Sequence, residues 1–269
     1  MPQIRVGERN VYYEVHGQGS GPPLMLIMGM GGSCRGWLPL QVPEFSRTRR
    51  TVIFDHPGVG GSDDTGEAVT TASLADNAVA LLDALGVARA DVLGVFMGGM
   101  VAQEVALRHP KRVNRLALTG TYARPDAKRR LLLEHWRSLA QARLPLEVVT
   151  RERLLWTLLD ETLEQSELIQ SMVDFFTRDD RPVDADVFAR QCEACLGHDT
   201  EDRLGDIRSR ALVICGERDL LTPPSLHRKL AEKIPDAHLV MIPYGAHLVM
   251  VESAEHFNKV VLEFVSEGL

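Results

Sequence analysis

The residues with the clearest chemical meaning lie within positions 91–100 of the chain. An apolar, strand-like run ends at Gly94, and a helix-like run begins at Met100. The segment between them has the spacing of the G-x-S-x-G motif, in which a serine on a sharp strand-to-helix turn attacks a carbonyl carbon. Phe96 stands at the serine position, and a phenyl ring can neither attack a carbonyl nor exchange a proton. The spacing therefore indicates an acyl-transfer site that lacks its nucleophile.

A phenylalanine at this turn has consequences for both conformation and chemistry. Such turns hold their central residue in a strained backbone conformation, which costs a bulky side chain about 1–3 kcal/mol. We expect the ring to point into the cavity that a substrate acyl group would fill. Loss of a triad serine lowers turnover about a millionfold. Ordinary acyl-enzyme hydrolysis at Phe96 is therefore not expected, and both a natural loss and an engineered change of the serine remain open.

A second cluster of reactive side chains is formed by Cys192, Cys195 and, a turn later, His198. Their spacing permits three ligands of a metal site. The alternative is a helix with two small apolar thiols one turn apart. No second ligand pair occurs elsewhere in the sequence, so we favour the helix and expect no metal.

The elements that must position these residues alternate between strands and helices. Apolar runs predict strands at 11–15, 24–28, 51–55, 90–94, 113–120, 211–215 and 238–242, and an amphipathic helix begins at residue 73. Strands separated by helices imply a mostly parallel sheet with both faces covered.

The stretch 124–205 interrupts this alternation, because it is poor in glycine and contains helix-like patterns at 131–139 and 153–163 without a convincing strand. We expect a helical cap there, inserted between sheet strands and covering their carboxyl ends, where open α/β sheets bind ligands. Residues 1–123 and 206–269 would form the core.

Taken together, these features resemble the α/β-hydrolase fold family, in its esterase, enol-lactonase and haloperoxidase-like branch. The resemblance covers nearly the whole chain and rests on motifs in the family's order, at residues 28–32, 55–62, 94–98, 215–219 and 244–252. It implies an α/β-hydrolase fold with a mostly parallel central sheet, flanking helices and an inserted helical cap.

The same resemblance implies roles for individual residues. Asp219 matches the acid of the catalytic triad and His247 matches its histidine, so the acid and the base are present while the nucleophile is not. The backbone N–H groups of Met30 and Met97 match the two donors of the oxyanion hole. An ordinary loop acid at Asp219 and a glycine-rich loop without a ligand around Met30 are the alternatives.

Another side chain could supply a displaced nucleophile. Ser33 and Cys34 follow the predicted oxyanion loop and would lie near the mouth of the pocket. Cys34 would be the better nucleophile if a neighbour such as Arg35 lowered the pKa of its thiol. A loop serine and a packed thiol are the alternative, which we favour.

Composition narrows the choice of partners. The net charge is −7, and no basic cluster with interleaved aromatic residues occurs, so neither nucleic acid nor a membrane surface is expected as a partner. The first residues lack the apolar core of a signal peptide, and four cysteines fit reduced thiols, so we expect a cytoplasmic protein. No cofactor is implied, the partner is a small-molecule substrate or ligand, and the sequence does not indicate the oligomeric state.

Three functions follow, in order of preference. The first is an esterase- or lactonase-type scaffold for a small apolar carbonyl substrate, with serine-dependent hydrolysis disabled by Phe96. The second is non-covalent general-base catalysis by His247 and Asp219, as in a lyase, cyclase, isomerase, decarboxylase or cofactor-independent oxygenase. The third is a small-molecule binding protein without turnover.

Overall fold

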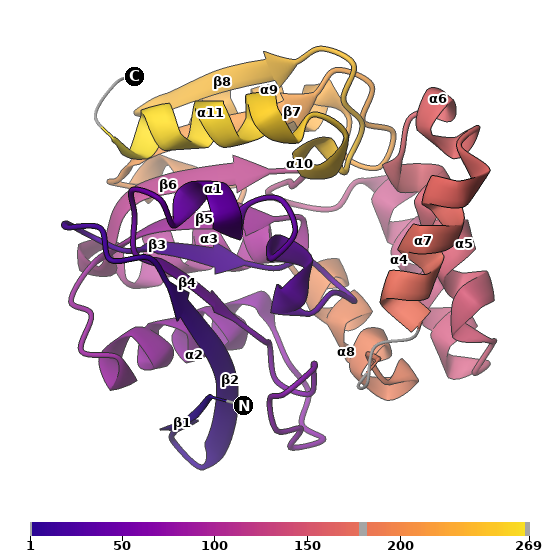
Figure 1. Ribbon diagram of the computed structural model, residues 1–269, viewed down its shortest axis with the longest axis horizontal. Helices are drawn as coiled ribbons and strands as arrows, with labels where there is room; N and C mark the ends of the chain where they lie inside the picture. The colour runs from indigo at the N-terminus through magenta and orange to yellow at the C-terminus, as the bar shows by residue number, and fades with distance from the viewer. Residues whose placement is uncertain (1, 178–181, 267–269) are drawn as a thin grey trace.

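Eight strands in the described part of the chain form one sheet in the order β1-β2-β4-β3-β5-β6-β7-β8 (Figure 1). The computed structural model describes residues 2–177 and 182–266. Only the pairs β1–β2 and β2–β4 are antiparallel, and the other neighbouring pairs are parallel. The strands are β1 Gln3–Val6, β2 Arg9–His16, β3 Leu24–Ile27, β4 Thr51–Phe54, β5 Ala90–Val95, β6 Val113–Thr119, β7 Arg210–Gly216 and β8 Ala237–Ile242. The predicted α/β class with a mostly parallel sheet is confirmed.

Helices pack along both faces of the sheet (Figure 1). They are α1 Val42–Phe45, α2 Thr71–Ala84, α3 Met97–Arg108, α9 Pro224–Lys233, α10 Val249–Glu252 and α11 Ala254–Val265. Every residue of β3, β4 and β5 is buried, as expected for continuous apolar strands covered on both sides. The helix predicted from residue 73 begins slightly earlier, because Thr70 and Ser73 form a capping box at its N-terminus.

Between β6 and β7 the described chain contains five α-helices, a short 3-10 helix at Leu204–Asp206 and no strand. The α-helices are α4 Ala127–Gln141, α5 Leu146–Thr157, α6 Asp160–Leu163, α7 Ser166–Thr177 and α8 Ala185–Leu196, and we call them together the helical insertion. Figure 1 shows this group as a separate body beyond the arrowheads of the parallel strands. The helical insertion therefore lies at the end of the sheet where the candidate site residues are expected. No helix in the described ranges is long and apolar enough to cross a membrane.

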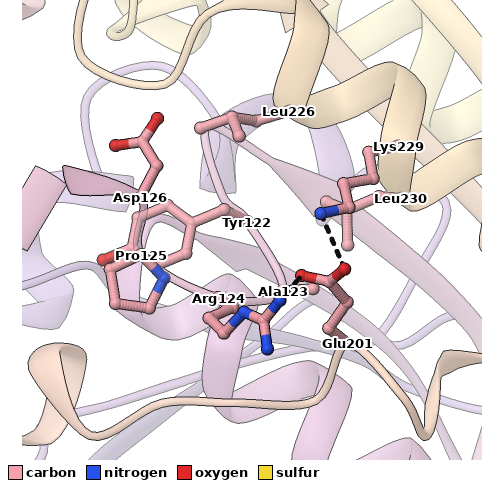
Figure 2. Close-up of a pocket in the computed structure, with 9 residues that line it drawn as sticks. All are labelled: Tyr122, Ala123, Arg124, Pro125, Asp126, Glu201, Leu226, Lys229 and Leu230. Atoms are coloured by element: carbon pink, nitrogen blue, oxygen red, sulfur yellow. Dashed lines mark ion pairs between the residues drawn. The ribbon is translucent and has the colours of Figure 1, made fainter. Parts of the chain in front are cut away.

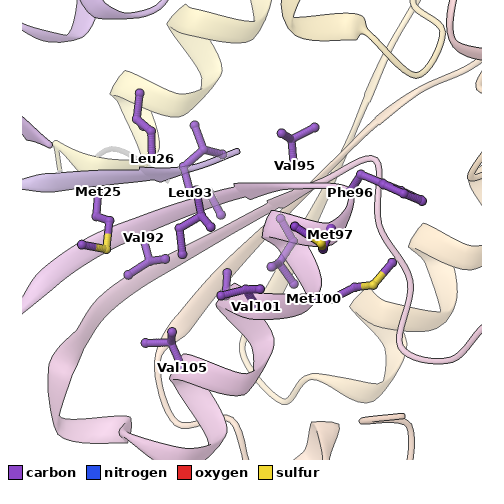
Figure 3. Close-up of a cluster of buried hydrophobic side chains, with 14 of the residues drawn as sticks. Met25, Leu26, Val92, Leu93, Val95, Phe96, Met97, Met100, Val101 and Val105 are labelled. Carbon is purple, nitrogen blue, oxygen red and sulfur yellow. The ribbon is translucent and has the colours of Figure 1, made fainter. Parts of the chain in front are cut away.

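The core beneath the site is built by β3, β5 and α3 (Figure 3). Its side chains are aliphatic or methionine and almost fully buried: Met25, Leu26, Val92, Leu93, Met97, Met100, Val101 and Val105. In Figure 3 the Phe96 ring extends beyond the end of β5. The turn between β5 and α3 thus rests on a closely packed base.

Candidate active site

Phe96 occupies the turn between β5 and α3 with φ 48° and ψ −111°. A positive φ is unfavourable for a bulky aromatic residue, and the strain is of the order of 1–3 kcal/mol. The backbone around Phe96 imposes this conformation. Its N–H donates to the Thr119 carbonyl (3.1 Å), and its carbonyl accepts from Met100 N–H (3.1 Å) and from the Thr121 hydroxyl (2.8 Å). The strained turn expected from the motif spacing is present.

The glycines that flank Phe96 are required by close backbone contacts. A Cβ at Gly94 would lie 2.1 Å from the carbonyl oxygen of Gly98, and a Cβ at Gly98 would lie 2.1 Å from that of Ile27. Both distances are far inside van der Waals contact, so no side chain fits at either position. The glycine spacing in the sequence therefore reflects how tightly this turn packs against β3.

The Phe96 side chain is 5% exposed and faces His247. The two ring centroids are 5.4 Å apart with an interplanar angle of 81°, and Tyr122 lies at 6.1 Å and 79° from Phe96. Both contacts have the edge-to-face geometry that aromatic rings favour. The side chain of residue 96 thus meets the imidazole directly, through a phenyl ring.

Asp219, after β7, and His247, after β8, are joined by a hydrogen bond of 3.0 Å between Oδ2 and Nδ1. Thr222 completes the group: its N–H donates to Asp219 Oδ1 and its hydroxyl to Oδ2, each at 2.7 Å. The Thr222 hydroxyl oxygen also lies 3.1 Å from His247 Nδ1. Sequence reasoning missed Thr222, and the only signal was its place three residues after an aspartate, where side-chain-to-backbone turns form.

The Asp219 carboxyl is almost completely buried. Burial alone would raise its pKa, but the charge and hydrogen bond of His247 and the Thr222 N–H outweigh burial and hold the pKa below its ordinary value. When the imidazole is neutral, a carboxylate that accepts from Nδ1–H leaves the lone pair of the ring on Nε2. Among the described residues, none hydrogen-bonds to Nε2 of His247. This nitrogen is therefore able to accept a proton from a bound molecule.

The predicted oxyanion loop is held by the helical insertion. The Met30 carbonyl accepts from Arg153 Nη2, and the Gly31 N–H donates to Gln191 Oε1, both at 2.8 Å. The Met30 N–H makes no hydrogen bond within the described part of the chain. Met97 is the first residue of α3, so its N–H lies outside the intrahelical ladder. Sequence reasoning missed Arg153 and Gln191, which lie 123 and 160 residues from the atoms they contact.

Cys34 and Ser33 lie next to this loop, at the start of a short 3-10 helix. Cys34 is fully buried, and its N–H donates to Asp55 Oδ1 at 2.7 Å. Burial and then the Asp55 charge raise the pKa of the Cys34 thiol well above its ordinary value, which disfavours the thiolate. Within the described ranges His247 bonds to Asp219 and Thr222, and to neither of these residues.

Cys192 and Cys195 lie on α8 and are buried, as is His198 just after it. His198 hydrogen-bonds through its two ring nitrogens to the hydroxyls of Thr71 (3.0 Å) and Thr200 (3.4 Å). In the part of the chain that the structure describes, no three side chains of metal-binding type come together. These contacts agree with a packed helix.

Tyr122 also lines a surface cavity of about 180 Å³ (Figure 2). Glu201 lies at its edge and pairs with Arg124 at 3.1 Å and Lys229 at 2.7 Å, as the dashed lines show. The lining carries two carboxylates, Asp126 and Glu201, and two cations, Arg124 and Lys229, so its charges balance and the cavity offers little for a charged ligand. We therefore place the candidate site at Phe96 and His247 rather than here.

The chain belongs to the α/β hydrolase fold family, whose profile matches residues 22–254. It is 32% identical over 273 residues to a protein of Azorhizobium caulinodans provisionally named carbamate hydrolase RutD, covering 99% of both chains. It is 32% identical over 252 residues to a Mycobacterium tuberculosis protein provisionally named non-heme bromoperoxidase BpoC, covering 91% of this chain and 94% of that one. The structure of the enol-lactonase from Burkholderia xenovorans LB400 matches with a TM-score of 0.82 and 29% identity, over 99% of this chain and all of that one.

Proposed function

We propose that this protein is an esterase- or lactonase-type scaffold for a small apolar carbonyl compound, in which Phe96 stands at the position of the nucleophile and prevents a covalent acyl-enzyme. The observation that carries the proposal is the Phe96 ring, 5.4 Å from the His247 ring on a turn with φ 48°. A hydroxyl at that position would face the base that activates it.

The remaining groups support a carbonyl compound as the substrate class. The N–H groups of Met30 and Met97 would donate to a developing oxyanion, and donors fixed in the backbone need not reorganise during reaction. Relatives named as an enol-lactonase and a carbamate hydrolase agree with this class. In this proposal the helical insertion, within residues 124–205, acts as a cap that covers the site.

Restoring the hydroxyl tests the proposal. Phe96→Ser should hydrolyse p-nitrophenyl butyrate at least about a thousandfold faster than the unaltered protein, given what a triad serine contributes. Phe96→Ala is the matched control, because it opens the same space without a nucleophile and should gain no comparable activity. Replacing His247 by alanine in the Phe96→Ser protein should abolish the gain. A folded Phe96→Ser protein no faster than Phe96→Ala would contradict the proposal.

A second candidate function is non-covalent general-base catalysis by the unaltered protein. It is favoured by the hydrogen bonds that hold His247 to Asp219 and Thr222, because a protein that only binds needs no such oriented base. Exchange of the acidic C–H of acetylacetone in D2O, followed by NMR, measures this. Exchange should be faster than in buffer, should fall to the buffer rate in His247→Ala, and should survive joint replacement of Ser33 and Cys34. Equal rates with and without His247 would eliminate general-base catalysis.

A further inference from the structure

A guanidinium group from the helical insertion lies directly on the predicted oxyanion loop. Arg153, on α5, donates from Nη2 to the Met30 carbonyl at 2.8 Å, and its Cζ lies 5.0 Å from the centroid of the Phe188 ring. A Cβ at Gly31 would lie only 2.7 Å from Arg153 Nη1. Glycine at position 31 therefore allows the cation to approach this closely.

No carboxylate in the described ranges pairs with Arg153. Glu152, its neighbour in the sequence, instead accepts hydrogen bonds from the indole N–H groups of Trp136 and Trp156. Burial lowers the pKa of the Arg153 guanidinium, because the charged form loses contact with water. A partly buried cation without an anion beside it is unfavourable, so an anionic ligand would supply the missing opposite charge.

A second donor lies beside the same loop. The Gln191 side chain, on α8, is 2% exposed and accepts from the Gly31 N–H through Oε1. Its Nε2 is buried and has no hydrogen-bond partner in the described part of the chain. A buried amide N–H without a partner costs free energy unless something binds to it. Arg153 and Gln191 thus hold opposite ends of one peptide group, between Met30 and Gly31, and each has donor capacity to spare.

Helix α5, which carries Arg153, also contacts the segment that carries the proposed base, His247. One turn beyond Arg153, the Thr157 carbonyl accepts from the N–H of Leu248, the residue after His247. Arg153 therefore comes from a helix that is docked on the His247 segment and reaches over to the Met30 loop. An anion held by its guanidinium would lie at the same end of the sheet as the proposed reaction site.

We propose that Arg153, assisted by the side-chain amide of Gln191, binds a carboxylate group of the substrate, so that the protein takes carboxylate-bearing carbonyl compounds in preference to neutral ones. The inference rests on the proposed function and refines its substrate class, from an apolar carbonyl compound to one that also carries a carboxylate beside its apolar part. The guanidinium fork matches a carboxylate in two parallel hydrogen bonds. The same guanidinium also donates to the Met30 carbonyl. Binding of the carboxylate would therefore help to position the peptide group next to the Met30 N–H.

Binding of two matched probes tests this inference without any turnover. The probes are 3-phenylpropanoate and 3-phenylpropanamide, which differ in charge and little in size, and calorimetry with the full chain measures their affinities. The acid should bind at least about tenfold more tightly than the amide, as expected for a charge-assisted hydrogen bond. Arg153→Met should abolish this preference while leaving binding of the amide unchanged. Arg151→Met is the control and should keep the preference, because Arg151 is an exposed side chain on the same helix that pairs with Glu147.

Two further variants keep the inference falsifiable if Arg153→Met does not fold. Gln191→Glu retains the acceptor for the Gly31 N–H but adds a negative charge, so it should weaken the acid at least about tenfold and spare the amide. Arg153→Lys keeps the charge without the fork and should retain part of the preference.

The inference is overturned if the unaltered protein binds the acid no better than the amide, or binds neither. It is also overturned if Arg153→Met or Gln191→Glu weakens both probes equally, since that is the result of a purely structural contact with the Met30 loop. These outcomes do not depend on whether Phe96→Ser gains esterase activity, so the two proposals fail separately.

Discussion

The strained turn at Phe96 predicts an inverted order of stability for two substitutions. Phe96→Ala and Phe96→Gly remove the same buried ring, and each should cost roughly 3–5 kcal/mol of unfolding free energy. They differ in the backbone, because alanine at φ 48° retains the strain of about 1–3 kcal/mol whereas glycine does not. Glycine in turn costs about 0.4–1 kcal/mol through its freer unfolded chain. The difference leaves Phe96→Gly more stable than Phe96→Ala by about 1 kcal/mol.

Urea unfolding followed by circular dichroism measures the difference, with Val95 as the reference position. Val95 is equally buried, one residue earlier in β5, and has ordinary strand geometry. There the usual order should hold, with Val95→Gly less stable than Val95→Ala by about 0.5–1 kcal/mol. If Phe96→Ala proves as stable as Phe96→Gly or more so, the turn at Phe96 stores no strain.

Three further predictions concern the surroundings of the site. Burial lowers the pKa of His56 to about 4 and that of His198 to about 3, from an ordinary value of 6.5. The stability that they contribute is therefore complete above pH 6.5 and is lost as the pH falls toward 4, because protonation favours the unfolded chain. Urea unfolding at pH 7.5, 5.5 and 4.5 should show the decline, and replacing both histidines by glutamine should flatten it; a flat profile in the unaltered protein would be contrary to this. Gly98→Ala should lower the free energy of unfolding by about 1–3 kcal/mol or more, because the new Cβ meets backbone rather than a movable side chain. A thermal midpoint unchanged from that of the unaltered protein would be incompatible with the close approach of Gly98 to the Ile27 carbonyl. In the Phe96→Ser protein, Thr222→Val should lower the rate of ester hydrolysis about tenfold and shift its pH–rate profile, because Asp219 loses a hydrogen bond worth about 1.5–3 kcal/mol. An unchanged profile would show that Thr222 does not position Asp219 for the reaction.

Local patterns in the sequence predicted the parts of the fold that local chemistry determines. The buried parallel strands are continuous apolar runs, and the turn at Phe96 is specified by flanking glycines whose steric need is visible in the structure. Strand β1 was missed, because Gln3–Val6 is a short, largely exposed edge strand with no apolar run. The helix predicted over 153–163 is two helices, α5 and α6. Their junction is stabilised from a distance, since the Glu252 carboxylate accepts from the Leu159 N–H at 2.8 Å and the Thr162 hydroxyl at 2.7 Å.

The candidate site likewise contains residues that the sequence predicted and residues that it did not. Asp219 and His247 were predicted because each follows a strand in a recognisable local motif, and the structure brings them into hydrogen-bond contact. Arg153 and Gln191 could not be predicted, because their meaning depends on how the helical insertion docks on the Met30 loop. That docking is a tertiary event between segments more than a hundred residues apart, and helical periodicity does not encode it. The substrate preference inferred for this protein therefore comes from the structure alone.

Covalent labelling measures whether the chain lacks an activated nucleophile because Phe96 stands at that position. A fluorophosphonate ester attaches only to an activated nucleophile and adds a defined mass to the chain. We expect no adduct on the unaltered protein, one adduct on Phe96→Ser that maps to position 96, and none when His247 is also replaced by alanine. An adduct on the unaltered protein at Ser33 or any other residue, or a folded Phe96→Ser protein that stays unlabelled, would contradict this expectation.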